Sequence, residues 1–107
     1  MSEFGLDKLI DVIRARRAAD GDSSYTRKLL DGGPALCAKK LGEEATEVVI
    51  AAMAGNSKEL RHEAADLVYH LLVLLEAGNV RFEDVLAELE GRTNRSGLEE
   101  KASRAKN

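Results

Sequence analysis

The sequence has few of the side chains that build a large hydrophobic core. Only 4% of its 107 residues are aromatic, tryptophan is absent, and 15 residues of the hydrophobic class are alanine. A chain of this length forms one compact domain, because two domains would each be too small to hold a core. The shortage of large side chains leaves a single subunit thinly packed, so we expect an oligomer that shares its core.

Cysteine, proline and long apolar runs are also scarce. The one cysteine, Cys37, cannot form an internal disulfide, and with only two histidines we do not expect a Cys/His zinc site. No apolar run approaches the ~20 residues that span a bilayer. The first residues do not form a basic-then-apolar leader. We therefore expect a cytoplasmic protein with no membrane partner.

Charge of one sign does not dominate the sequence. Charged residues make up 33% of the chain and the net charge is −3, which does not match the basic surface of a nucleic-acid-binding protein. The end of the chain differs, because residues 92–107 carry five Lys or Arg against two Glu, with Leu98 as the one large apolar side chain. We expect residues 1–91 to form the domain and 92–107 to be a basic tail, flexible or packed on a neighbouring subunit.

Glycine and proline divide the chain into segments with helical periodicity, and the alternating Val/Ile/Thr runs typical of sheet are nearly absent. We expect an all-α protein built as an antiparallel helix bundle. The expected helices cover residues 4–19, 34–54, 57–77 and 82–89, with a loop over 19–26 and a short helical turn at 28–30. Pro34 suits a first helical turn because its missing N–H would be unpaired there.

The acidic residues of the two long helices occupy unusual positions. At about 100° per residue, the helix over 34–54 has an apolar stripe and an adjacent acidic sector. The stripe contains Leu41, Ala45, Val48 and Ala52, and the acidic sector contains Glu43, Glu44 and Glu47. In the helix over 57–77, Glu63 and Asp66 share the apolar sector instead. An unpaired carboxylate in a dry sector is costly or takes up a proton, so these two acids point to a function.

The spacing of these acids predicts a metal site. Glu44 and Glu47 are three residues apart, as are Glu63 and Asp66, so each pair projects from one face of its helix. The short connection at 55–57 makes the two helices antiparallel neighbours. Carboxylates that converge between them repel one another unless a cation lies among them. Oxygen ligands select a hard ion, Mg²⁺ or Mn²⁺.

Besides a protein with a Mg²⁺ or Mn²⁺ site, two further classes of protein have similar acidic helices. A ferritin-like di-iron bundle uses Glu-x-x-His pairs, whereas Asp66 follows Glu63 at that spacing and His70 is seven residues away. A non-catalytic helical dimerisation module would use the acids only to solvate one face. Catalytic activity that depends on a divalent metal distinguishes an enzyme from such a module.

The strings KKLGEEATEVVIAA (39–52) and EAADLVYHLLVLL (63–75) contain EExxE and ExxD motifs, and SSYTRKLLDGG (23–33) precedes them. In this pattern the chain resembles the all-α nucleotide pyrophosphohydrolases of the MazG and dimeric dUTPase superfamily, and within it the phosphoribosyl-ATP pyrophosphohydrolases of histidine biosynthesis. The resemblance covers about residues 4–90. It implies a homodimer or larger assembly and hydrolysis of the α–β phosphate bond of phosphoribosyl-ATP, with phosphoribosyl-AMP and pyrophosphate as products. A relative that hydrolyses another nucleoside triphosphate would carry the same acids.

The resemblance also assigns roles to individual residues. The metal ligands it implies are Glu44, Glu47, Glu63 and Asp66, and Glu43 is a further ligand or the group that orients or deprotonates water. Cations near the acids should bind the phosphates of a small-molecule nucleotide: Lys39 and Lys40 first, then Lys28, Arg14 and Arg17. The implied substrate contacts are Ser24, Tyr25 and Thr26, which with Arg27 and Lys28 would recognise the ribose-5-phosphate. His70 is either a core histidine or a phosphate contact.

Overall fold

The computed structural model describes residues 3–19 and 24–94, and these ranges contain five α-helices and no β-strand. The helices are α1 (Leu6–Ala18), α2 (Tyr25–Asp31), α3 (Gly33–Met53), α4 (Ser57–Ala77) and α5 (Phe82–Thr93). The expected all-α class is confirmed. The basic tail expected over 92–107 lies, from residue 95 onward, outside the described residues. Among the described residues no helix has the length and apolar character needed to cross a membrane.

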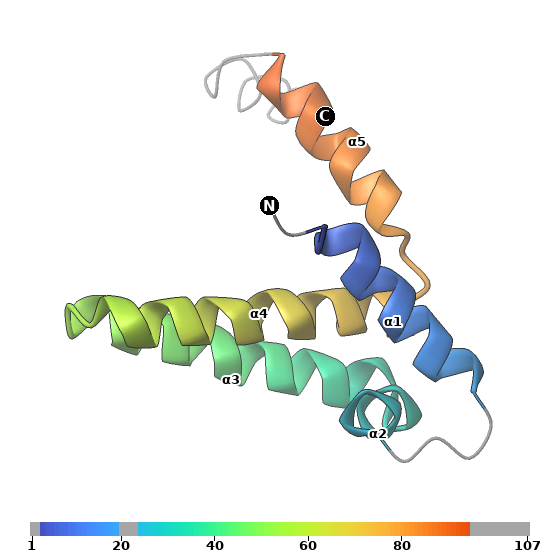
Figure 1. Ribbon diagram of the computed structural model, residues 1–107, viewed down its shortest axis with the longest axis horizontal. Coiled ribbons are helices and arrows are strands. Elements are labelled where there is room, and N and C mark those ends of the chain that lie inside the picture. Colours follow the sequence, from blue (N-terminus) through green and yellow to red (C-terminus); the bar gives the residue numbers. More distant parts are fainter. Residues whose placement is uncertain (1–2, 20–23, 95–107) are drawn as a thin grey trace.

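A tight turn makes α3 and α4 an antiparallel hairpin, in which the two helices lie side by side (Figure 1). Gly55 has a left-handed backbone with φ of 71°. The Gly55 N–H donates to the Ala52 carbonyl at 3.1 Å and the Asn56 N–H to the Ala51 carbonyl at 3.4 Å, the pairing of a Schellman motif. The Asn56 side chain then caps α4 by accepting from the Glu59 N–H at 3.0 Å. This turn sets the register of the acidic residues on the two helices.

Two glycine substitutions test this turn. Gly55→Ala should destabilise the protein by about 1–2 kcal/mol, because a Cβ is unfavourable in left-handed backbone. The matched change Gly42→Ala lies inside α3, where an added Cβ meets nothing within 4 Å, and should stabilise by about 0.5–1 kcal/mol. Thermal unfolding followed by circular dichroism measures both. Equal melting temperatures for the two variants would contradict the role given to the turn.

The core lies at the end of the hairpin where α1 and α2 cross it (Figure 1). Its buried members come from four helices: Ile10, Ile13, Leu29, Cys37, Leu72 and Val73. The Cys37 thiol donates to the Leu29 carbonyl at 3.2 Å, and burial raises its pKa. The interpretation of Cys37 as a small buried hydrophobe is therefore confirmed.

The apolar stripe expected on α3 is wrong in part. Ala45 and Ala52 are exposed, and Ala51 is the buried alanine of that half of the helix. The helical wheel assumed a broad core contact, but the described contacts of α3 are mainly with α4. A single neighbouring helix covers a narrower strip than a bundle does.

Much apolar surface is left uncovered in the single chain. On α3, Val49, Ile50 and Met53 are exposed, and Met53 is 83% exposed. Helix α5, all of which is described, has no buried residue and extends away from the hairpin (Figure 1). This exposure agrees with the thin core expected from the composition.

Candidate metal and substrate site

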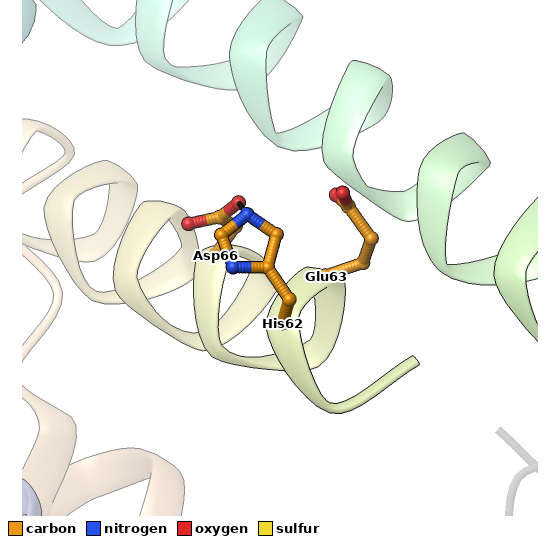
Figure 2. A group of neighbouring side chains, drawn as sticks. All are labelled: His62, Glu63 and Asp66. Carbon is orange, nitrogen blue, oxygen red and sulfur yellow. Dashed lines mark ion pairs between the residues drawn. The ribbon is translucent and has the colours of Figure 1, made fainter. Parts of the chain in front are cut away.

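Glu63 is at the centre of a carboxylate cluster between α3 and α4. Its half-buried side chain points toward α3 (Figure 2). Partial burial raises its pKa most, followed by a hydrogen bond with the Glu44 side chain and the negative charges of Glu44 and Asp66, while His62 opposes the shift. Neighbouring carboxylates repel each other, and a shared proton or a bound cation relieves that repulsion. The fold therefore brings Glu44, Glu63 and Asp66 together as the spacing predicts.

Glu47 faces the same region from α3. Glu47 and Glu63 line a cavity of about 150 Å³ between the two helices, and Glu59 of α4 lines it too. The acids lie at the solvent-exposed edge of the hairpin, since Glu47 is exposed and the Asp66 side chain is 40% exposed. The expectation that Glu63 and Asp66 project from the driest sector of α4 is thus wrong, because α3 covers that sector only partly.

The sequence analysis did not identify His62 as part of this cluster. His62 Nε2 lies 3.5 Å from the Asp66 carboxylate. One ligand atom each from His62, Glu63 and Asp66 lie within 4.8 Å of one another (Figure 2). The sequence does contain an indication of this role for His62: Asp66 follows it by four residues, and this spacing places both side chains on one face of a helix.

The first turn of α2 contacts α4 beside this cluster. The Ser24 hydroxyl caps α2 by accepting from the Arg27 N–H at 3.2 Å. Tyr25 and Thr26 are therefore helical, and the loop expected to extend to residue 26 is wrong there. Ser and Thr are preferred N-caps, so two adjacent serines before Tyr25 could have indicated this helix start. Residues 20–23 of that loop lie outside the described residues.

His70 links α2 to α4 from the interior and is only 6% exposed. Its Nδ1 lies 2.7 Å from the Asp66 backbone carbonyl, which can only accept, so Nδ1 carries a hydrogen. In the neutral ring Nε2 then accepts from the Tyr25 hydroxyl at 3.2 Å. Both ring nitrogens are thereby used within the protein. These contacts favour the interpretation of His70 as a core histidine.

The other predicted substrate contacts have different surroundings. Thr26 is 6% exposed and its hydroxyl bonds to the Tyr69 hydroxyl, so it does not present a surface to a ligand. Tyr25 is 52% exposed. Partial burial raises its pKa, Lys40 opposes this, and Tyr69, Glu44 and Glu43 add to it. Tyr25 is thus placed beside the acidic cluster.

The basic residues that were predicted to bind phosphate differ in their surroundings. Lys40 is near Tyr25 and pairs with Glu43 at 3.4 Å, while Lys28 and Lys39 are exposed. Arg27 instead bonds Asp31 at 2.9 Å and the Ala19 carbonyl at 2.5 Å. It therefore ties α2 to the end of α1, and a role in phosphate recognition is not supported.

Arg14 and Arg17 were candidates for phosphate contacts, but they join α1 to the end of α4. Arg17 pairs with the Glu76 carboxylate at 2.9 Å and donates to the Asn79 side chain at 3.1 Å. Arg14 lies 3.6 Å from Glu76. Glu76 is ten residues, nearly three helical turns, beyond Asp66. This correction reflects tertiary pairing that a count of basic residues does not reveal.

The fold and site together define an all-α protein whose helical hairpin carries a carboxylate cluster suited to a divalent cation. The model of the phosphoribosyl-ATP pyrophosphohydrolase family matches residues 6–93. The chain belongs to this family.

Individual relatives agree with this assignment. The phosphoribosyl-ATP pyrophosphatase of Nitrobacter winogradskyi is 56% identical over 104 residues, covering 97% of this chain and 90% of the relative. The protein of that name from Parvibaculum lavamentivorans is 58% identical over 99 residues, covering 92% and 91%. A third, from Paracoccus denitrificans, is 53% identical over 100 residues, covering 94% and 93%.

Proposed function

We propose that this protein hydrolyses phosphoribosyl-ATP at its α–β phosphate bond, releasing phosphoribosyl-AMP and pyrophosphate in histidine biosynthesis. The observation that carries the proposal is the convergence of Glu44, Glu47 and Glu63 between α3 and α4 in a chain of this family. A cluster of carboxylates repels a polyanionic substrate unless bound cations reverse the local charge. The site therefore suits a nucleotide that arrives with, or at, divalent metal.

The residues present fit a Mg²⁺ ion. We assign its ligands to Glu44, Glu47, Glu63 and Asp66, which supply the oxygen donors that this ion prefers. The same carboxylate oxygens also suit Mn²⁺. When bound, the ion stabilises the negative charge that develops on the leaving pyrophosphate.

The remaining side chains of the site have roles that follow from their positions. The Glu43 carboxylate forms an ion pair with Lys40 and can orient or deprotonate the attacking water. Lys40 supplies positive charge to the phosphates next to Tyr25. Lys39 precedes Lys40 in α3 and is exposed, so it is a second source of positive charge there.

A pyrophosphate-release assay tests the proposed function. Purified protein with Mg²⁺ is supplied with phosphoribosyl-ATP, ATP, dUTP and dCTP in parallel, and omission of metal is the control. We expect the highest kcat/KM for phosphoribosyl-ATP. Preference for a plain nucleoside triphosphate would instead indicate a house-cleaning pyrophosphohydrolase, and no release with any substrate would favour a non-catalytic module.

Selection of phosphoribosyl-ATP over ATP must depend on residues outside the acidic helices, because both substrates carry the same triphosphate. Lys28 of α2 is exposed and supplies the charge that the extra phosphate needs. Lys28→Ala should lower kcat/KM for phosphoribosyl-ATP by about ten- to a hundredfold and leave residual ATP cleavage nearly unchanged. Lys8→Ala on α1 is the matched control. Equal losses for both substrates would show that Lys28 supports the fold or the metal site.

We further propose that the active form is a cytoplasmic homodimer or larger assembly. The cavity beside Glu47 is about 150 Å³, whereas pockets for small molecules are about 300–1,000 Å³. The exposed Ile50 of α3 lines that cavity, and the exposed Val49 and Met53 are on the same turn of α3 as Ile50. A second copy packed on these residues would cover the apolar surface and enclose the site.

A further inference from the structure

Tyr69 is a partly buried residue of α4 that has no role in the site as described above. Its hydroxyl shares a hydrogen bond with Thr26 in the first turn of α2. Its ring stacks on that of Tyr25, with centroids 6.4 Å apart and planes inclined by 20°. It also meets the His70 ring edge-on at 5.1 Å. One side chain thus contacts Tyr25, Thr26 and His70, which lie together where the first turn of α2 meets α4.

We infer that Tyr69 is a positioning residue, which holds the first turn of α2 against α4 and so keeps Tyr25 beside Glu44 and Lys40. The inference rests on the proposed function, because it assigns Tyr25 to the substrate site. Helix α2 has only seven residues and is too short to be stable alone. Its place therefore depends on the side chains that tie it to neighbouring helices.

The bond from Tyr25 to His70 does not hold the Tyr25 ring by itself. Tyr25 is 52% exposed, so its ring has room to turn toward solvent. The ring of Tyr69 packs on one side of it, and the bond to the buried Thr26 hydroxyl fixes the adjacent backbone. Loss of that bond leaves a buried hydroxyl without its partner, and the first turn of α2 must shift to satisfy it.

Two variants remove the two partners of the same hydrogen bond: Tyr69→Phe, which keeps the ring, and Thr26→Val, which keeps the volume. Each should raise KM for phosphoribosyl-ATP by about three- to tenfold, with kcat changed less than twofold.

The double variant Tyr69→Phe with Thr26→Val should show no further rise in KM, because both changes remove the same interaction. Thr26→Ser retains the hydroxyl and should restore the wild-type KM. Thr93→Val, which deletes the bond to the Glu90 carbonyl at the end of α5, is the matched control.

A second measurement does not depend on turnover. Tyr25 and Tyr69 are the two tyrosines of the chain, and tryptophan is absent, so NMR signals of the tyrosine rings are assigned directly with Tyr69→Phe. In Thr26→Val the Tyr25 signals should move toward the values of an unstructured peptide, and in Thr93→Val they should stay in place.

Unmoved Tyr25 signals in Thr26→Val would overturn the inference, as would an unchanged KM in both single variants. Additive increases of KM in the double variant would also overturn it, because two independent contacts would then be involved. If the wild-type protein does not hydrolyse phosphoribosyl-ATP, the proposed function fails, and the ring signals still decide whether Tyr69 positions Tyr25.

Discussion

Alanine in place of Glu47 or Asp66 is expected to reduce turnover of phosphoribosyl-ATP by about a hundred- to a thousandfold, because a metal ligand contributes several kcal/mol to stabilising the transition state. The helical fold should survive, since Glu47 is exposed and Asp66 is only partly buried, and removing either leaves no core cavity. Pyrophosphate release at saturating Mg²⁺ and the circular dichroism spectrum measure the two properties. Glu90→Ala, an exposed acid of α5, is the control.

Full activity of Glu47→Ala would contradict its assignment as a ligand. A loss of activity accompanied by a loss of helical signal would assign it a structural role instead. Partial recovery of a variant at high Mg²⁺ or Mn²⁺ concentration would support the assignment, because weaker metal binding is compensated by mass action.

The same cluster has a measurable effect on stability without metal. The fold raises the pKa of Glu63 above its ordinary value of 4.5, so ionisation of Glu63 is less favourable in the folded than in the unfolded chain. Its contribution to stability is therefore complete below pH 4.5 and is lost as the pH rises through the raised pKa of the folded state. Glu63→Gln should remove this pH dependence and raise the melting temperature of metal-free protein at neutral pH. Added Mg²⁺ should stabilise the wild type more than this variant.

Dissociation of the assembly is the second large effect that we expect. Sedimentation at micromolar concentration should show at least a dimer for the wild type. The double change Val49→Lys with Met53→Lys puts two charges, four residues apart, on one exposed face of α3. These charges would lie in the apolar contact between the two copies, so they should weaken association by at least about a hundredfold. Each 1.4 kcal/mol of lost binding free energy raises Kd about tenfold.

The activity of this double variant should fall with association, since the cavity beside Glu47 is too small for a nucleotide in one chain. Glu90→Lys reverses a charge on α5 and should leave both properties unchanged. A wild-type protein that is folded and fully active as a monomer would overturn the proposed assembly.

Much of the local structure was predictable because it depends on neighbouring residues. The predicted limits of the helix over 57–77 are confirmed, since Asn56 and Gly78 lie at its caps. Helix α3 begins one residue earlier and ends one earlier than predicted. The start of α2 was misplaced, because the hydroxyl of Ser24 acts as a cap in a segment whose composition is typical of a loop.

The tertiary contacts of individual side chains were less predictable. The sequence predicts phosphate contacts for Arg17 and Arg27, yet each bonds a carboxylate and a backbone carbonyl of the protein. Thr26 and Tyr25 are adjacent, but one is buried and the other half exposed. Position along the chain does not distinguish such cases, because the neighbouring helix decides which side is covered.

The sequence by itself determined the all-α class, the order of the helices and the pairing of acids at three-residue spacing, because helical periodicity and capping are local properties of the chain. The three-dimensional packing decided which of these acids meet across the hairpin, that His62 joins them and that His70 is used internally. It also decided that Tyr69 contacts Tyr25 and Thr26. These relations join residues on different helices or select one face of a helix, so they depend on how the helices pack, which the periodicity of one segment does not specify.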